Sequence, residues 1–426
     1  MGAAALVIAC GADPALAGGA TDAAATGGAA GQRSAATLAA CLARLREQAL
    51  ARGLRAETFD RHTRALLPDP GVLGLLQTQP EFRTPIWDYL APLVDAERIR
   101  DGRAALDAWR TSLDAIERRF GVDRAVVVAV WGIESDYGRR FGQRPVLRSL
   151  ATLACFGRRQ SFFGGELLAA LQILEQGHVD PARFVGSWAG AFGQTQFMPS
   201  TFLRTAVDLD GDGRRDIVDS VPDALASSAS FLERAGWRSG EPWGFEVRLP
   251  PDFDPASAGR RNKRPLAAWI RGGIVHVDAR PIDPEALGLS GASRAAALVP
   301  ALADRSAKAA GNGGIGPAFL VFRNFDAIVR YNASESYALA IAHLADRLRG
   351  AGPFAVAWPT EDPGLDRAQR RELQRRLRAR GHDIGPVDGL IGARTRAAIR
   401  IEQSRLGLEP TGRAGVTMLE ALPAAR

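Results

Sequence analysis

The sequence predicts a mainly helical fold of the α+β class, with one large domain and a small C-terminal domain. Apolar residues recur at helical spacing through most of the chain. The segment from about 241 to 325 differs, because it is rich in Pro, Gly and Trp and contains short alternating runs. From residue 366 onward the chain is helical and Arg-rich again. With 426 residues, 46% of them hydrophobic, it is long enough for two domains with real cores.

The first 35 residues indicate a leader. Residues 2–10 are small and apolar, residues 15–17 (ALA) resemble a signal-peptidase site, and residues 7–10 (VIAC) resemble a lipobox. We therefore expect residues 1–35 to be a signal peptide or flexible leader. We also expect export to the periplasm or cell envelope, with a lipoprotein anchored through Cys10 as one form. A disordered Ala/Gly tail is the alternative, since no Lys or Arg precedes the apolar run.

Helical patterns organise the large domain, which we place at residues 36–349. The first helix is expected over residues 36–53 and stops at Gly53, a C-cap signal. Further helices are expected over residues 103–119, 121–134, 162–176, 222–235 and 333–349. Within this body, residues 241–325 predict a smaller, substrate-facing subdomain with some strand, including runs at 245–249 and 274–278. Prolines and glycines near the ends of residues 350–365 predict a linker before a second domain at 366–424.

Two cysteines remain if processing removes or lipidates Cys10. An oxidising compartment could pair Cys41 with Cys155, which would tie the first helix to a loop of the large domain. Two separate buried thiols are an equally open alternative.

Glu134 is the candidate for acid–base chemistry. Residues 121–131 are apolar nearly all round, so this helix should be buried. It runs into residues 132–138 (GIESDYG), where Gly138 suits a left-handed C-cap. Desolvation near the end of a buried helix would raise the pKa of Glu134, and a protonated carboxyl can protonate a glycosidic oxygen. From this segment alone, a solvated or capping glutamate is the alternative.

Four ordered segments carry a family resemblance. Residues 134–138 (ESDYG) resemble the catalytic E-S-x-[FY]-G stretch of lytic murein transglycosylases of the B type, glycoside hydrolase family 103. Residues 158–167 (RRQSFFGGEL), 186–200 (GSWAGAFGQTQFMPS) and 324–337 (NFDAIVRYNASESY) resemble the segments that follow in that family. The resemblance covers about residues 36–350 and implies a lysozyme-like helical catalytic domain.

The resemblance also implies a reaction. Glycosidases normally pair two carboxylates, but no second acid stands in an equivalent motif, and Asp136 would point to a different helix face from Glu134. The family's solution is one glutamate that acts first as acid and then as base. The β-1,4 bond between N-acetylmuramic acid and N-acetylglucosamine is cleaved without water, which leaves a 1,6-anhydromuramoyl end. No cofactor takes part. A hydrolytic muramidase and a non-catalytic peptidoglycan-binding protein are the alternatives.

Polar side chains in the same motifs are candidates for binding the glycan and its stem peptides. They are Ser187, Gln196, Asn332, Tyr137, Tyr331, Tyr337, Arg158 and Arg159. The first three line the cleft by resemblance, since Ser and amide groups suit hydroxyl and acetamido partners. The tyrosines offer ring faces and hydroxyls, and the arginines suit stem-peptide carboxylates or the lactyl oxygen. Ordinary structural hydrogen bonding is the alternative for each.

Residues 208–219 (DLDGDGRRDIVD) resemble an EF-hand calcium loop. The candidate ligands are Asp208, Asp210, Asp212, Asp219 and Asp223. Asp219 is shorter than the usual bidentate Glu, and an arginine stands where an aliphatic residue is expected. A structural calcium or sodium ion is therefore one interpretation, and an Asp/Gly turn without metal is the other.

Residues 366–420 resemble the small three-helix peptidoglycan-binding domain of wall hydrolases. The resemblance is carried by residues 373–374 (LQ), 385–389 (GPVDG) and 411–412 (TG) among others. The formal charge of +7 favours an anionic partner, and the arginines of this domain suit stem-peptide carboxylates. Nucleic acid is disfavoured because the domain lacks aromatic residues for base stacking. We expect a monomer that binds peptidoglycan glycan strands and stem peptides, with peripheral or no membrane contact.

Overall fold

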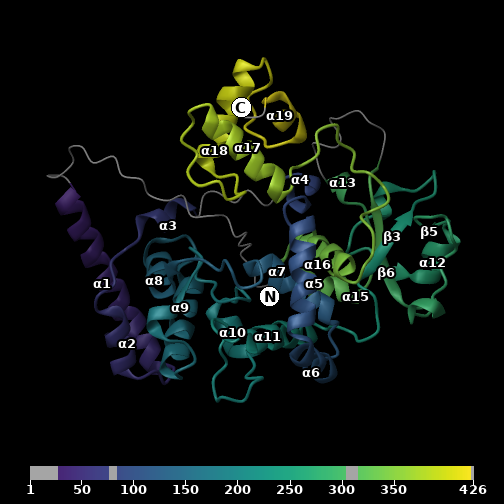
Figure 1. Ribbon diagram of the computed structural model, residues 1–426. Helices are drawn as coiled ribbons and strands as arrows, with labels where there is room; N and C mark the ends of the chain where they lie inside the picture. The colour runs from purple at the N-terminus through teal and green to yellow at the C-terminus, as the bar shows by residue number, and fades with distance from the viewer. Residues whose placement is uncertain (1–26, 76–83, 304–314, 424–426) are drawn as a thin grey trace.

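The computed structural model describes residues 27–75, 84–303 and 315–423, and it is mainly helical with small sheets (Figure 1). This confirms the predicted fold class. Residues 1–26 of the expected leader, with Cys10, lie outside the described residues, whereas residues 27–35 belong to the first helix. No helix in the described ranges has both the length and the apolarity needed to span a membrane.

The large domain is built from helices on both sides of a buried central helix. Its first helices are α1 (Gly27–Ala51), α2 (Ala56–Thr63), α3 (Pro70–Leu75), α4 (Ile86–Leu90), α5 (Ala96–Ala108), α6 (Arg110–Phe120) and α7 (Arg124–Ser135). The later ones are α8 (Val146–Phe156), α9 (Gln160–Glu175), α10 (Pro199–Thr205), α11 (Val221–Arg234), α12 (Leu266–Arg271), α13 (Pro300–Ala303), α15 (Arg323–Asn332) and α16 (Glu335–Leu348). The helix expected over residues 103–119 is in fact two helices, because the chain breaks at Trp109 between α5 and α6.

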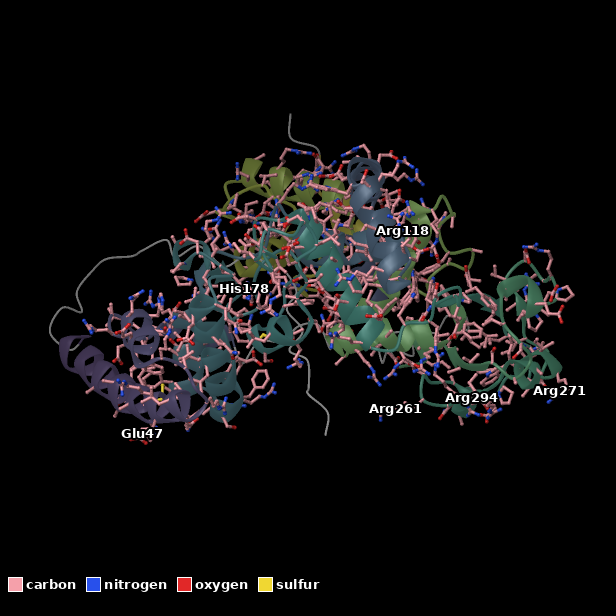
Figure 2. All side chains as sticks on the ribbon, turned by 90° about the horizontal axis from the view of Figure 1, so that it is seen from below. Glu47, Arg118, His178, Arg261, Arg271 and Arg294 are labelled. Carbon is pink, nitrogen blue, oxygen red and sulfur yellow. A yellow bond between two sulfur atoms is a disulfide. The ribbon has the colours of Figure 1, made fainter. Side chains whose placement is uncertain are left out.

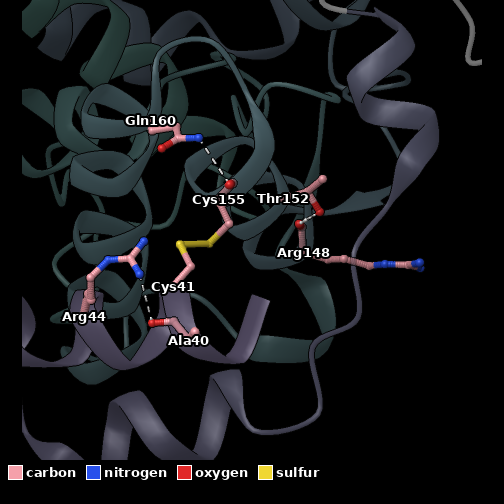
Figure 3. Close-up of a disulfide and its surroundings, with 7 residues drawn as sticks. All are labelled: Ala40, Cys41, Arg44, Arg148, Thr152, Cys155 and Gln160. Atoms are coloured by element: carbon pink, nitrogen blue, oxygen red, sulfur yellow. Dashed lines mark hydrogen bonds between the residues drawn. A yellow bond between two sulfur atoms is a disulfide. The ribbon is translucent and has the colours of Figure 1, made fainter. Parts of the chain in front are cut away.

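One apolar cluster joins α1, α2, α8, α9 and α10. Phe163, Leu167 and Leu171 of α9 are fully buried in it. A disulfide between Cys41 and Cys155 links α1 to α8, as Figure 3 shows. The paired form of the two cysteines is therefore confirmed, although Cys155 lies in a helix rather than in a loop.

A second apolar cluster surrounds α7, which packs against α5, α6, α11 and α16. Every residue of α7 from Ala125 to Ser135 is buried, as the apolar run predicts. Asp123 caps its N-terminus by accepting hydrogen bonds from the N–H groups of Ala125 and Val126. The helix is therefore fixed at its start and enclosed along its length.

The subdomain at 241–325 contains a five-stranded antiparallel sheet, as the sequence predicts in part. Its order is β4-β6-β7-β3-β5, and a separate pair joins β1 to β2. The strands are β1 (Arg144–Pro145), β2 (Val185–Gly186), β3 (Gly244–Arg248), β4 (Arg264–Pro265), β5 (Val275–His276), β6 (Arg294–Leu298) and β7 (Ala318–Val321). Successive residues of β7 face opposite cores, because Phe319 packs in the α7 cluster and Leu320 in the cluster around α12.

The subdomain and the α1 region form opposite ends of the molecule. In Figure 2, Glu47 of α1 lies near one end, and Arg271, at the end of α12, lies near the other. Helix α7 therefore lies in the body between two separately packed regions (Figure 1).

The C-terminal domain has the three helices that the sequence predicts, α17 (Arg367–Ala379), α18 (Ala393–Arg405) and α19 (Val416–Ala421). They enclose a core of their own that includes Leu373 and Leu377. The segment expected to be a linker, residues 350–365, has no helix or strand but packs on the large domain. Phe354 stacks on His343 with ring centroids 3.8 Å apart, and Glu246 accepts hydrogen bonds from two backbone N–H groups of the segment.

Candidate active site

Glu134 is the penultimate residue of α7 and is only 5% exposed. Burial raises the pKa of its carboxyl group to about 8, and a hydrogen bond from the Tyr337 hydroxyl opposes this rise in part. The hydroxyl of Tyr337 donates to Oε1 of Glu134 across 203 residues of chain, from the first turn of α16. A carboxyl group with this pKa is mostly protonated at neutral pH and can donate a proton.

A row of packed aromatic rings begins at Tyr337, whose hydroxyl bonds the Glu134 carboxyl group. Tyr337 stacks on Tyr331 with centroids 6.3 Å apart, and Tyr331 in turn packs on Phe231 at 4.7 Å. The Tyr331 hydroxyl donates to the carbonyl oxygen of Thr195 at 2.8 Å. Burial holds the pKa of both tyrosines well above the usual value, so both hydroxyls remain donors near neutral pH. Two of the three predicted tyrosines are thus brought to the glutamate.

The third, Tyr137, has a different position. Its hydroxyl donates to the carbonyl oxygen of Arg98 at 2.7 Å. A Cβ added at Gly102 of α5 or at Gly132 of α7 would lie within 2.4 to 2.8 Å of this side chain. Tyr137 therefore packs between two helices, where the absence of side chains at these glycines gives it room, and it fixes the end of α7.

Left-handed backbone begins earlier than expected at this helix end. The C-cap of α7 is Asp136, with φ 52°, and Tyr137 follows with φ 59°. Gly138 is also left-handed, but it is the third residue of the run and not the cap itself. A residue with a side chain does not fit in place of Gly138, because its Cβ would lie 2.6 Å from Oε1 of Gln194.

The segment 186–200 contributes Gln194 and Gln196. Gln194 accepts a hydrogen bond from the Trp131 indole of α7 at 2.9 Å and donates to the carbonyl oxygen of Val218 at 3.0 Å. Gln196 is left-handed, with φ 50°, and donates to the carbonyl oxygens of Phe141 and Gly193. Gln194 therefore ties the segment to the helix that carries Glu134, and the turn at Gln196 is held by its own side chain.

Two buried amide oxygens in this region have no partner in the structure. They are Oε1 of Gln196 and Oδ1 of Asn332, whose residues are 8% and 6% exposed. Asn332 adjoins Tyr331, and Gln196 adjoins Thr195, so the Tyr331 hydrogen bond brings the two segments together. Buried acceptors are normally satisfied, and hydroxyl or acetamido groups of a glycan could donate to these two.

The other predicted contacts lie as follows. Ser187 is 9% exposed, and its hydroxyl accepts a hydrogen bond from the N–H of Ala191 at 3.1 Å. Arg158 is exposed and Arg159 lies over the ring of Phe162, at the turn between α8 and α9 beside the disulfide. The structure therefore gives Ser187 a turn-forming role and places the arginine pair on the surface.

Asp136 is turned toward arginines and not toward Glu134. Its Oδ1 lies 2.9 Å from Arg367, 3.1 Å from Arg139 and 3.5 Å from Arg98. Burial alone would raise the pKa of this carboxyl group, but the three guanidinium groups hold it below its usual value. Asp136 is therefore an ionised anchor, and the sequence argument that it faces away from Glu134 is confirmed.

The acidic loop brings three of its five candidate ligands together. Carboxylate oxygens of Asp208, Asp210 and Asp212 lie within 4.8 Å of one another. Asp219 pairs instead with Arg183 at 2.5 Å. Asp223 is buried, and its two oxygens accept hydrogen bonds from backbone N–H groups of the loop. Asp219 and Asp223 are thus not part of the cluster in this structure. Asp223 instead holds the backbone of the loop through these two hydrogen bonds.

Sequence reasoning missed Gln194 and Arg367. Gln194 stands two residues before Gln196 in the same segment, so its polar side chain in an apolar run was an available signal. Arg367 belongs to the C-terminal domain, and nothing in the sequence indicates that it reaches Asp136 across 231 residues.

The chain matches two family models. That of the transglycosylase SLT domain matches residues 37–346, and that of a peptidoglycan binding domain matches residues 366–422. The chain is 29% identical over 204 residues to membrane-bound lytic murein transglycosylase B of Escherichia coli K12. This match covers 45% of the chain and 56% of that relative, so it spans little more than half of the curated protein.

Solved structures agree with these matches. SltB3 of Pseudomonas aeruginosa, in complex with NAG-anhNAM-pentapeptide, is 47% identical with a TM-score of 0.70, and the match covers 90% of this chain and 99% of that one. Escherichia coli Slt35 in complex with calcium is 25% identical with a TM-score of 0.60, over 72% of this chain and 92% of that one.

Proposed function

The chain belongs to the transglycosylase SLT domain family, and from this membership we propose that it cleaves peptidoglycan glycan strands without hydrolysis, with Glu134 as its acid and base. The single observation that supports this role best is the burial of Glu134, which raises the pKa of its carboxyl group to about 8. A neutral acid at the end of a fixed helix suits protonation of a glycosidic oxygen.

In the proposed reaction, the Glu134 proton passes to the oxygen of the β-1,4 bond, and the N-acetylglucosamine 4-hydroxyl leaves. The acetamido group of the muramic acid assists this departure. The resulting carboxylate then accepts the proton of the muramic acid 6-hydroxyl, whose oxygen attacks C1. No water is consumed, the product ends in 1,6-anhydromuramic acid, and Glu134 regains its proton.

The surroundings of Glu134 support both of its states. The Tyr337 hydroxyl can donate to the carboxylate that forms after the first proton transfer. The buried oxygens of Gln196 and Asn332 are suited to accept hydrogen bonds from sugar hydroxyl or acetamido N–H groups. Binding of the glycan there would satisfy acceptors that burial otherwise penalises.

Mass spectrometry of the muropeptides released from purified peptidoglycan tests the proposal. We expect products lighter than hydrolytic muropeptides by the mass of one water, because the 6-hydroxyl and not water closes the reaction. Reducing ends would make the chain a hydrolytic muramidase. No release at all, with binding retained, would make it a peptidoglycan-binding protein.

We place the enzyme in the cell envelope, with the C-terminal domain holding it on the wall and its stem peptides. The match to a peptidoglycan binding domain and the related complexes with peptidoglycan pentapeptides support this placement. The Cys41–Cys155 disulfide is consistent with export to an oxidising compartment. Fractionation of cells and labelling of free thiols would test export, and a cytoplasmic protein with two free thiols would contradict it.

We propose that the cluster of Asp208, Asp210 and Asp212 holds a structural calcium ion. Alternating carboxylates around Gly211 and Gly213, both left-handed, are the donor set that a hard cation prefers. The calcium complex of the related Slt35 supports the assignment. Calcium should raise the melting temperature of the chelator-treated protein, and Asp210→Asn should remove this response. An identical melting temperature with and without calcium would contradict the proposal.

A further inference from the structure

The C-terminal domain is joined to the large domain by ion pairs that begin at its first helical residue. Arg367, the N1 residue of α17, contacts Asp95 through two nitrogens at 2.6 and 2.8 Å. A third nitrogen donates to Asp136 at 2.9 Å. The Arg367 side chain is only 12% exposed and that of Asp95 only 3%, so these bonds are shielded from water.

The two partners of Arg367 are the ends of two packed helices. Asp95 is the N-cap of α5 and accepts a hydrogen bond from the N–H of Arg98. Asp136 is the C-cap of α7, two residues after Glu134. One guanidinium group therefore joins the start of α5 to the end of the helix that carries the proposed acid.

The end of α7 needs such support because its backbone conformation is unusual. Asp136 and Tyr137 are consecutive non-glycine residues with positive φ. Conformations of this kind persist only when the surrounding structure holds them. Tyr137 is held by its packing against Gly102 and Gly132, and Asp136 is held by arginines.

The other arginines near Asp136 cannot replace Arg367. Arg98 lies at 3.5 Å from Asp136, and its buried Nε and Nη1 atoms have no hydrogen-bond partner. Arg139 is half exposed and is shared with Asp101. Of these side chains, Arg367 bonds Asp95 and Asp136 together.

We propose that Arg367 is a positioning residue of the active site, through which the C-terminal domain holds the end of α7 and thereby the Glu134 carboxyl group. The inference rests on the proposed role of Glu134. It makes the C-terminal domain more than a wall anchor, because one of its side chains completes the support of the acid.

The test compares Arg367→Gln with the wild-type full chain on soluble, uncrosslinked glycan strands. We expect kcat to fall at least tenfold while KM stays within twofold, since the substrate-facing groups are unchanged. Binding to insoluble sacculi should also stay within twofold. Arg367→Lys should recover part of kcat, because one ammonium group can pair with either acid but cannot form the same fork of bonds.

Asp136→Asn is a second test of the same contact, and it leaves the Arg367–Asp95 contact in place. It can be used even if Arg367→Gln does not fold. We expect it to lower kcat in the same way. The double variant should be no slower than the slower single variant, because the proposed effect on kcat depends on the Arg367–Asp136 contact, which either substitution alone already breaks. Glu97→Gln is the matched control, since it removes the half-exposed interdomain pair with Arg371 and should leave kcat unchanged.

A kcat within twofold of wild type in folded Arg367→Gln or Asp136→Asn would overturn the inference. Multiplicative losses in the double variant would do the same, as would an equal loss in Glu97→Gln. The proposed function is judged separately, by whether the wild-type enzyme releases anhydro products.

Discussion

Glu134 and Asp136 are two acids at the end of one helix, and their surroundings give them different protonation states at neutral pH. Glu134 faces aromatic rings and a tyrosine hydroxyl, and burial raises the pKa of its carboxyl group to about 8. Asp136 faces three guanidinium groups, which hold the pKa of its carboxyl group below the usual value. Two residues of separation place the side chains on different faces of the chain.

The comparison shows that a position at the end of the helix does not by itself determine which of the two acids is the proton donor. Both residues lie in the same motif and within one turn of each other. What differs is the surroundings: Asp136 is paired with arginines from α5, from the loop after α7 and from the C-terminal domain, whereas burial dominates at Glu134. Burial keeps the proton on Glu134, and the guanidinium groups keep Asp136 ionised as an anchor.

The largest effect should come from Glu134→Gln. Gln keeps the shape and can accept the Tyr337 hydrogen bond, but it has no proton to transfer. We expect release of anhydromuropeptides to fall by about a thousandfold or more, in line with the loss of a general acid–base group. Release is measured by mass spectrometry, with sacculus binding as the control for folding. Lytic activity retained at the wild-type level would show that another residue is the acid.

A smaller loss of activity is expected for Tyr337→Phe, which removes the hydrogen bond from the tyrosine hydroxyl to the Glu134 carboxyl group. The carboxylate formed during the reaction loses a charge-assisted hydrogen bond, so we expect kcat to fall by about 10- to 100-fold. Steady-state kinetics on soluble glycan measures this. An unchanged kcat would mean that Tyr337 supports structure only, and its melting temperature would then be the informative comparison.

The pH dependence separates the two acids further. Because the free enzyme must carry a proton on Glu134, kcat/KM should be level below about pH 8 and fall about tenfold per pH unit above it. The Tyr337 hydrogen bond lowers the pKa of Glu134, so Tyr337→Phe should move this fall to higher pH. A fall that begins below pH 6 would contradict the burial argument.

The smallest effects concern stability, and they have opposite signs. Unfolded Glu134 ionises near its ordinary pKa of 4.5, but folded Glu134 keeps its proton to about 8, so wild-type stability falls as pH rises between these values. Glu134→Gln removes this loss, and its advantage in free energy of unfolding should grow by roughly 2–4 kcal/mol from pH 5 to pH 8.

Asp136 has the reverse linkage. Its pKa is lowered on folding, so its stabilisation is present above the ordinary value of 3.8 and is lost as pH falls through the folded pKa. Asp136→Asn should therefore be less stable at pH 7, by about 1–3 kcal/mol, and lose this difference in acid. Denaturant unfolding across pH measures both variants. Equal slopes with pH for wild type and Glu134→Gln would show that folded Glu134 is ionised.

The sequence predicts much of this arrangement where the signal is local. The apolar run over residues 121–131, which leads into Glu134, predicts a buried helix, and the four motifs predict which segments accompany it. Tyr331 and Tyr337 are candidate glycan contacts from the sequence, and the structure brings both of them to Glu134. The pairing of Cys41 with Cys155 was open from the sequence, since two thiols were equally consistent with it.

Long-range geometry is what the sequence could not supply. Tyr137 shares a motif with Glu134, yet the glycines of two helices give it room away from the carboxyl group. Asp219 was a candidate ligand by loop position, but Arg183 from another segment pairs with it. Arg367 reaches Asp136 only because two domains pack together. Each depends on a partner far along the chain, which periodicity and spacing do not reveal.

The measurement that tests the comparison most directly is infrared difference spectroscopy of the wild-type protein against Glu134→Gln, recorded from pH 5 to pH 9. If burial keeps the proton on Glu134, the difference spectrum at pH 7 should contain the C=O band of one protonated carboxyl group from the wild-type protein, since carboxyl groups common to both proteins cancel. It should disappear with a midpoint near pH 8. A carboxylate band for Glu134 already complete at pH 6 would contradict the central claim, because the residue would then be ionised like Asp136.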